Sequence, residues 1–240
     1  MEDTGARVTS PGRNARTKVR LKTGKGRSVS SKRWLTRQLN DPYVARARSE
    51  GYRSRAAYKL AEIDDRFGFL KRGARVLDLG AAPGGWSQVA AERVGAGEGR
   101  ELVLAVDLLD MPAIPGVECA RLDFLDRDAP ERLKALLGGG ADVVLSDMAA
   151  PTIGHAKTDH IRIMGLAETA AAFAADVLEP GGVFLCKVFQ GGTERDLLAA
   201  LKRDFTTVRH VKPPASRSES SELYVLATGF RGGSASNGIT

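Results

Sequence analysis

A glycine-rich segment between a short apolar run and a helical pattern is the feature that most constrains this chain. Residues 75–79 predict a strand, residues 86–94 predict a helix, and Gly80-Ala-Ala-Pro-Gly-Gly85 joins them. Glycines let the backbone turn tightly and pass close under a ligand. The segment therefore predicts a strand–turn–helix unit that binds a small molecule at its turn, and a tight turn without a ligand is the alternative.

The alternation of strand and helix continues along the chain after this unit. Further strands are predicted over residues 102–108, 120–125, 141–146 and 183–189, and helices over 130–137, 161–178 and 194–205. An early helix is predicted over residues 54–67, with Ser54 as its N-cap and Gly68 as its terminator. Two late strands, 207–211 and 223–227, have no helix between them. The pattern predicts an α/β, Rossmann-like fold: a mostly parallel seven-stranded sheet with helices on both faces and an antiparallel edge hairpin.

Composition narrows the class of protein further. The chain has 240 residues, 42% of them apolar, which is enough for one sizeable core. No apolar run approaches the roughly 20 residues of a membrane span, and the polar, basic N-terminus is unlike a secretory signal. Two cysteines in strand-like runs, Cys119 and Cys186, favour a reducing cytoplasm over a disulfide scaffold. We expect a disordered basic arm over residues 1–30, a single domain over 31–230 and a flexible tail over 231–240.

The net charge of +7 is distributed unevenly. Residues 1–75 hold 20 of the 36 basic and 7 of the 29 acidic residues, a net charge of +13. The remaining residues hold 16 basic and 22 acidic residues, a net charge of −6. A basic front on a mildly acidic body is typical of proteins that bind nucleic acid. A solubilising tail with no specific role is the alternative.

The chemistry around the glycine turn favours one kind of ligand. The turn lacks the G-x-G-x-x-G spacing of a dinucleotide site, and Pro83 removes one N–H that a phosphate cradle would use. A ligand with a cationic sulfonium and an amino-acid end fits better, because the carboxylate of Asp78 favours positive charge. Asp107, which ends the second strand, can accept hydrogen bonds from a ribose diol. Asp123, which ends the third predicted strand, can accept from an adenine amine.

Further charged residues are predicted at the same edge of the sheet. Asp147 follows the fourth strand, and Glu222 starts the last strand, whose antiparallel direction brings its start to this edge. Lys187 lies inside an otherwise apolar strand, where a lysine is costly to bury unless it is paired. Lys59 lies on the early helix and is placed less firmly by spacing. We expect Lys187 to point into a polar cleft, and a snorkelling lysine near a strand end is the alternative.

Four segments carry a resemblance to a known family: Asp78–Gln88, Ser146–Pro151, Leu185–Phe189 and Ser220–Tyr224. They resemble the FtsJ/RlmE family of S-adenosylmethionine-dependent ribosomal RNA 2′-O-methyltransferases, and the likeness extends over about residues 34–230. The resemblance implies a class I methyltransferase fold, S-adenosylmethionine as cofactor and a catalytic tetrad of Lys59, Asp147, Lys187 and Glu222. It also implies cofactor contacts at Gly84, Trp86, Asp107, Asp123 and Asp147.

The resemblance implies that the substrate is a uridine ribose in the A loop of 23S rRNA, within the large ribosomal subunit. We expect the protein to need neither a membrane nor an obligate protein partner. The 2′-hydroxyl would attack the sulfonium methyl in line. Lys187 would either accept the hydroxyl proton or, if it stays charged, stabilise the developing alkoxide. The basic arm, Arg53, Arg55 and Lys59 would hold the RNA backbone.

Other functions remain open on the sequence alone. They are a 2′-O-methyltransferase of transfer RNA or another RNA, a non-catalytic RNA-binding assembly factor, and a nucleotide-dependent dehydrogenase, which the spacing of the glycine turn disfavours. A metal site is not expected, because His155 and His160 are five residues apart, the wrong spacing for one helix face.

Overall fold

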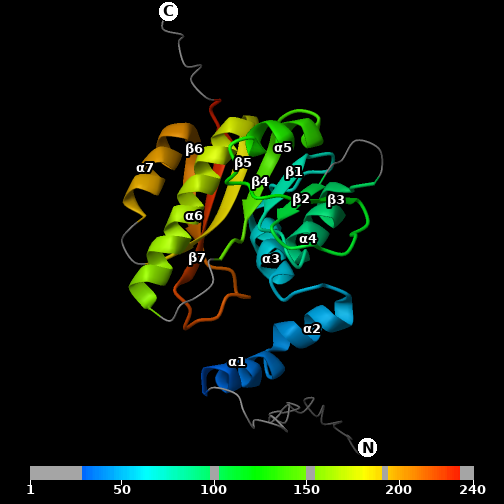
Figure 1. The fold of residues 1–240 in the computed structure, drawn as a ribbon, viewed down its shortest axis with the longest axis vertical. Coiled ribbons are helices and arrows are strands. Elements are labelled where there is room, and N and C mark those ends of the chain that lie inside the picture. The colour runs from blue at the N-terminus through cyan, green and yellow to red at the C-terminus, as the bar shows by residue number, and fades with distance from the viewer. Residues whose placement is uncertain (1–28, 98–102, 150–154, 191–193, 233–240) are drawn as a thin grey trace, which may run out of the picture. The chain divides into compact units, whose positions relative to one another are not determined.

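The computed structural model describes residues 29–97, 103–149, 155–190 and 194–232 (Figure 1). It divides the chain into two compact units, residues 1–45 and residues 46–240. The first unit contains α1 (Val29–Leu39) and the start of α2 (Pro42–Glu50). The predicted arm and tail, residues 1–30 and 231–240, fall outside the described residues except at two positions each.

The second unit is built on a seven-stranded sheet with the order β3-β2-β1-β4-β5-β7-β6. The strands are β1 (Val76–Leu79), β2 (Val103–Asp107), β3 (Val117–Arg121), β4 (Ala141–Ser146), β5 (Leu178–Phe189), β6 (Phe205–Val211) and β7 (Glu222–Phe230). The pairs among β1 to β5 are parallel, and β7 is antiparallel to both β5 and β6. The predicted mostly parallel sheet with an antiparallel edge hairpin is confirmed.

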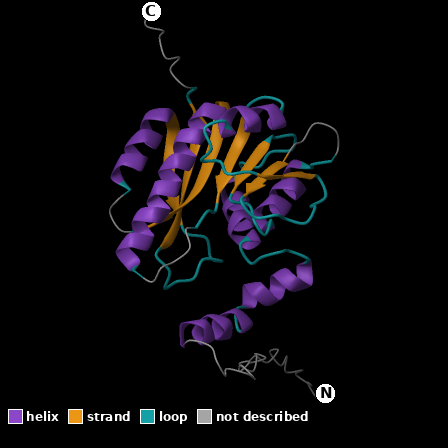
Figure 2. Ribbon diagram, in the orientation of Figure 1, coloured by secondary structure: helices purple, strands orange, loops and turns teal. Residues whose placement is uncertain are grey.

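Helices cover both faces of this sheet (Figure 2). One face packs against α3 (Ala57–Phe67) and α4 (Gly85–Val94), and the other against α5 (Ala129–Leu137), α6 (Ala156–Val177) and α7 (Arg195–Asp204). Neighbouring strand residues alternate between the two cores: Val76 packs with α3 and α4, and Leu77 packs with the other three helices. Burial on both faces explains why the central strands β1, β2 and β4 are mostly apolar.

The strand order reverses between β1 and β4, which is where open α/β sheets bind ligands. The turn after β1 and the residues after β2 and β4 meet at this carboxyl edge, which we call the rim. The antiparallel register pairs Phe189 with Glu222 and Lys187 with Tyr224, so the start of β7 reaches the same rim.

The third strand differs from the sequence prediction of residues 120–125. β3 begins at Val117, after a turn in which Gly116 has a φ of 72°, and it ends at Arg121. Leu122 is buried and Phe124 partly buried against the helical core, where Phe124 meets Phe173 edge-on, and neither residue pairs in the sheet. Asp123 therefore lies two residues beyond the strand, in a turn.

Two helix starts also differ from the predictions. Ser54 is not an N-cap: α3 starts at Ala57, and Ala56 precedes it without a side-chain cap bond. Gly68 ends α3 with a φ of 59°, as predicted. The long helix α6 starts at Ala156, five residues before the predicted 161, because the ring of His155 accepts a hydrogen bond from Thr158 N and caps it.

The buried face of α5 allows a test of the packing. Leu133 is fully buried and Leu136 on the same helix is 38% exposed. We predict that Leu133→Ala lowers the free energy of unfolding by about 2 to 5 kcal/mol, because it leaves a cavity. Leu136→Ala, the matched control, should change it by less than about 1 kcal/mol. Urea denaturation of the two variants measures both values, and equal losses would contradict the described orientation of α5.

Candidate active site

The glycine turn after β1 lies against the segment that follows β4. Gly80 has a φ of 72°, and a Cβ added there would overlap the side chain of Met148. Gly84 has a φ of 103°, and a Cβ added there would lie 2.6 Å from Cδ1 of Ile114. Both positions therefore require glycine for conformation and for space. The turn, the start of α4 and the segment after β4 form one continuous surface at the rim.

The carboxylate of Asp107 shapes the turn as well as facing the rim. One oxygen accepts a hydrogen bond from Ala82 N at 2.9 Å, and the other accepts from Leu109 N at 2.8 Å. Asp123 likewise accepts from Leu125 N at 2.9 Å. Both acidic residues are half-buried, and their backbone bonds hold Asp107 at the end of β2 and Asp123 in the turn that follows β3.

Asp78 is buried inside β1, two residues before the glycine turn begins at Gly80. Its Oδ2 accepts a hydrogen bond from Ser87 Oγ at 2.6 Å, and its Oδ1 has no partner. Burial raises the pKa of this carboxyl from 3.8 to about 7, and the hydrogen bond from Ser87 only partly offsets that rise. Because Asp78 titrates near neutrality, a nearby positive charge would shift it toward the ionised form.

The side chain of Trp86 has a structural role. Its Nε1 donates to Ala56 O at 2.9 Å, its ring centre lies 5.5 Å from that of Tyr224, and it is 3% exposed. These contacts fix the start of α4 against the segment before α3. A cofactor contact at Trp86 would therefore come from its backbone N–H, at the N-terminus of α4.

The structure brings the four predicted tetrad residues together at the rim. Nζ of Lys187 lies 3.1 Å from Oδ1 of Asp147 and donates to the backbone oxygen of the same residue at 2.6 Å. Nζ of Lys59 lies 2.7 Å and 2.8 Å from the two carboxylate oxygens of Glu222. The side chains are 7% to 19% exposed, so each charge is largely removed from water and is paired.

Tyr224 joins the two pairs, and the sequence prediction missed it. Its hydroxyl donates to Oδ1 of Asp147 at 2.9 Å and accepts from Nζ of Lys59 at 3.2 Å. Burial raises the pKa of Tyr224 well above its usual range, so the hydroxyl stays protonated. The available signal was its place two residues after Glu222, which puts both residues on one face of β7. We call Lys187, Asp147, Tyr224, Lys59 and Glu222 the rim network.

The two cysteines and His210 are the remaining candidate groups. Cys119 and Cys186 are both free thiols, and burial raises the pKa of Cys186 to about 12, which makes it a poor nucleophile. His210 pairs with Glu194 at 2.8 Å on the far edge of the sheet. Among the residues that the structure describes, no three His, Cys, Asp or Glu side chains are grouped to hold a metal ion.

The fold and the rim together define the class of protein: a Rossmann-like methyltransferase, with a glycine turn after β1 and acidic residues after β2 and β3. The FtsJ-like methyltransferase model matches residues 52–230. The chain belongs to the FtsJ-like methyltransferase family and is an enzyme of that class.

Two curated relatives are named Ribosomal RNA large subunit methyltransferase E. The protein from Bradyrhizobium diazoefficiens is 69% identical over 91% of this chain and 96% of its own length. The protein from Nitrobacter hamburgensis is 68% identical over 90% of this chain and 95% of its own length. A solved structure described as a ribosomal RNA methyltransferase from Plasmodium falciparum is 30% identical, with a TM-score of 0.67, and covers 76% of this chain and 100% of that one.

The cofactor of this family is S-adenosylmethionine, and the rim fits it. Gly80 and Gly84 leave the space that a ligand needs close to the backbone. Inside β1, Asp78 keeps one buried carboxyl oxygen without a hydrogen-bond partner, which would favour a cationic group nearby. Asp107 lies at the end of β2, where an acidic residue accepts from a ribose diol.

The raised pKa of Asp78 predicts how stability depends on pH. The folded state holds this proton more tightly than the unfolded state, so its stabilising contribution is complete below pH 3.8 and is lost as pH rises to about 7. Asp78→Asn removes the titration but keeps the hydrogen-bonding shape. We predict that the variant gains stability relative to the wild type, by at most about 4 kcal/mol, between pH 4 and pH 7.

Urea denaturation of both proteins at several pH values gives this difference directly. A difference that is flat across the range would contradict the buried, proton-binding state of Asp78.

Proposed function

We propose that this enzyme transfers the methyl group of S-adenosylmethionine to the 2′-hydroxyl of a uridine ribose in the A loop of 23S rRNA, within the large ribosomal subunit. The rim network beside the glycine turn is the observation that carries the proposal. The relatives named as large-subunit rRNA methyltransferases support the substrate. Methylation of transfer RNA and a non-catalytic assembly role are the alternatives.

The proposed roles of the rim residues follow from their contacts. S-adenosylmethionine supplies an electrophilic methyl group, so the protein has to position the ribose oxygen and manage one proton. Lys187, held by two oxygens of Asp147, would donate a hydrogen bond to the 2′-oxygen and stabilise the negative charge that develops there. As the new carbon–oxygen bond forms, the sulfur would keep the electron pair of the broken carbon–sulfur bond and the hydroxyl proton would leave to water. Lys59 and Glu222 hold Tyr224, and through it Asp147, in place.

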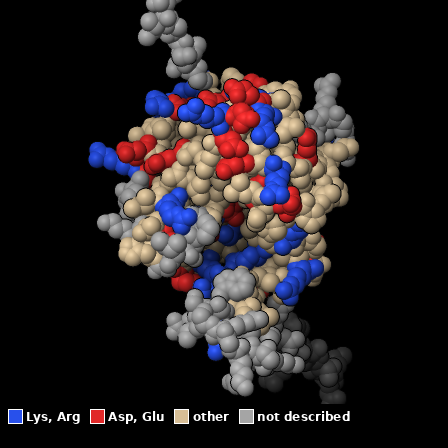
Figure 3. Space-filling model, in the orientation of Figure 1, with Lys and Arg blue, Asp and Glu red and all other residues tan. Residues whose placement is uncertain are grey.

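The surroundings of the rim support an RNA substrate. Figure 3 shows basic side chains gathered toward the lower part of the view and both signs of charge mixed over the upper part. None of the helices in the described part of the chain is long and apolar enough to cross a membrane.

The proposed substrate also gives the location and the partner of the enzyme. We place the enzyme in the cytoplasm, where the large ribosomal subunit is its partner and no further protein is required.

Replacing Lys187 tests the catalytic assignment. We predict that Lys187→Ala lowers single-turnover methylation of large subunits by about 10²- to 10⁴-fold, because the group that stabilises the 2′-oxygen is removed. Its affinity for S-adenosylmethionine should stay close to the wild-type value, and Lys134→Ala on the outer face of α5 is the matched control. Retained turnover in Lys187→Ala would end this assignment.

Deleting residues 1–30 tests the arm, which lies largely outside the described residues. It carries eight Lys and Arg residues. We predict that RNA affinity falls while cofactor affinity does not. The slope of log affinity against log salt should flatten by about 0.9 for each duplex phosphate that the arm no longer neutralises. Equal RNA affinity with and without the arm would contradict this prediction and would support a solubilising tail with no role in RNA binding.

The substrate is tested by mapping the modified ribose. Large subunits from a strain lacking this protein, incubated with the enzyme and radiolabelled S-adenosylmethionine, should gain one methyl group on an A-loop uridine. Label on transfer RNA in place of 23S rRNA would favour the first alternative. Binding to the subunit without any label would favour the assembly factor.

A further inference from the structure

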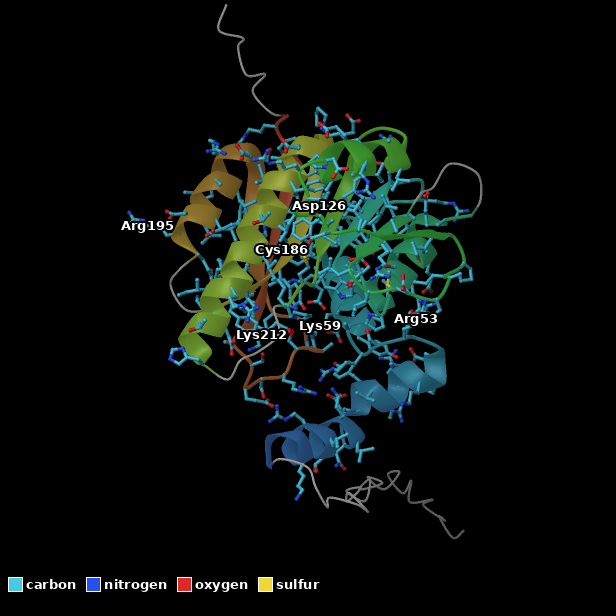
Figure 4. All side chains as sticks on the ribbon, viewed as in Figure 1. Arg53, Lys59, Asp126, Cys186, Arg195 and Lys212 are labelled. Carbon is cyan, nitrogen blue, oxygen red and sulfur yellow. The ribbon has the colours of Figure 1, made fainter. Side chains whose placement is uncertain are left out.

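Arg53 precedes α3 and hydrogen bonds to two different loops. Its guanidinium donates from Nη1 to Pro112 O at 2.8 Å and from Nη2 to Ala113 O at 2.7 Å. A longer bond from Nη1 reaches Pro83 O at 3.4 Å. The carbonyl groups lie 30 to 60 residues away along the chain, so the bonds hold together segments that only the fold brings near one another. Figure 4 shows Arg53 on the side of the unit where α4 lies.

Hydrogen bonds between Gln88 and the backbone around Arg53 fix the position of Arg53. Arg53 N donates to Oε1 of Gln88 at 2.8 Å, and Nε2 of Gln88 donates to Gly51 O at 3.0 Å. Gln88 lies in the first turn of α4, directly after the glycine turn. The guanidinium is therefore anchored to the same helix start that forms one wall of the cofactor site.

The two loops that Arg53 joins follow β1 and β2. Pro83 and Gly84 belong to the glycine turn, and Pro112 and Ala113 lie in the loop that follows Asp107. Ile114 in the second loop touches the first, because a Cβ on Gly84 would lie 2.6 Å from its Cδ1 and 3.2 Å from Nη1 of Arg53. The separation of the two loops at this edge is thus set by Arg53 and Ile114.

We propose that Arg53 is a positioning residue for cofactor binding, which holds the glycine turn and the loop after Asp107 at the separation that S-adenosylmethionine requires. The sequence interpretation assigned Arg53 to the RNA backbone. In the structure its guanidinium is directed at protein carbonyl groups: the planar fork binds the adjacent carbonyls of Pro112 and Ala113, and Nη1 also reaches Pro83 O in the glycine turn. The inference rests on the proposed use of S-adenosylmethionine.

Arg53→Lys separates the two roles, because lysine keeps the positive charge but not the fork. We predict that the dissociation constant for S-adenosylhomocysteine, measured by calorimetry, rises about tenfold, which corresponds to the removal of one or two hydrogen bonds. Affinity for large subunits and the turnover rate at saturating cofactor should change by less than about twofold. Ile114→Val, which removes Cδ1 without changing charge, should weaken cofactor binding in the same direction.

Arg231→Lys is the matched control. Arg231 follows the far end of β7 and donates to the carbonyl groups of Lys202 and Arg203 at 3.0 Å and 2.6 Å, so the substitution removes a similar bridge away from the rim. It should alter the melting temperature without altering cofactor affinity. Because binding is measured below the melting midpoint of each variant, a lower stability does not obscure the comparison.

Two results would overturn the inference. One is unchanged cofactor affinity in Arg53→Lys, and the other is an equal loss of cofactor affinity in Arg231→Lys. A fall in RNA affinity without a change in cofactor affinity would also overturn it, and would support the role of Arg53 in binding the RNA backbone. If the wild-type protein itself failed to bind S-adenosylhomocysteine, the proposed function would fail, so the two failures are distinguishable.

Discussion

The geometry of the rim depends on two lysine–carboxylate pairs that are joined by one tyrosine hydroxyl. Removing one partner from such a pair leaves an uncompensated charge, which costs about 3 to 5 kcal/mol when the pair is fully buried. The pairing of Lys187 with Asp147 and of Lys59 with Glu222 therefore fixes where β4, β5, β7 and α3 meet. Tyr224 makes the two pairs one unit, because its hydroxyl contacts both.

The short segment before α3 joins this network to the cofactor side of the rim. Arg53 contacts the loops beside the glycine turn, and Arg55 donates to the carbonyl of Ala215 in the loop that leads to β7. In that loop the hydroxyl of Ser216 donates to Glu222 at 2.8 Å, and the backbone N–H of Ala215 donates to Glu62 on α3 at 2.6 Å. One segment thus orders the loops on both sides of the place where methyl donor and acceptor would meet.

Sequence patterns predicted the rim well wherever a residue is placed by a strand end. Asp107, Asp147 and Glu222 border strands, and parallel and antiparallel directions alone bring them to one edge. The patterns did not predict Tyr224 or the carbonyl contacts of Arg53, because those partners are fixed by sheet register and by loop carbonyl groups that no spacing reveals. The third strand was misplaced because burial under a helix produces the same apolar residues as pairing in a sheet.

A double-mutant cycle on the rim network tests the central claim most directly. Single-turnover methylation is measured for Lys59→Met, Glu222→Gln and the double variant, with cofactor affinity as the control. If the two residues act as one unit, the double variant loses no more activity than the more damaged single variant. Losses that multiply would show that Lys59 and Glu222 act independently, and would contradict a single network at the rim.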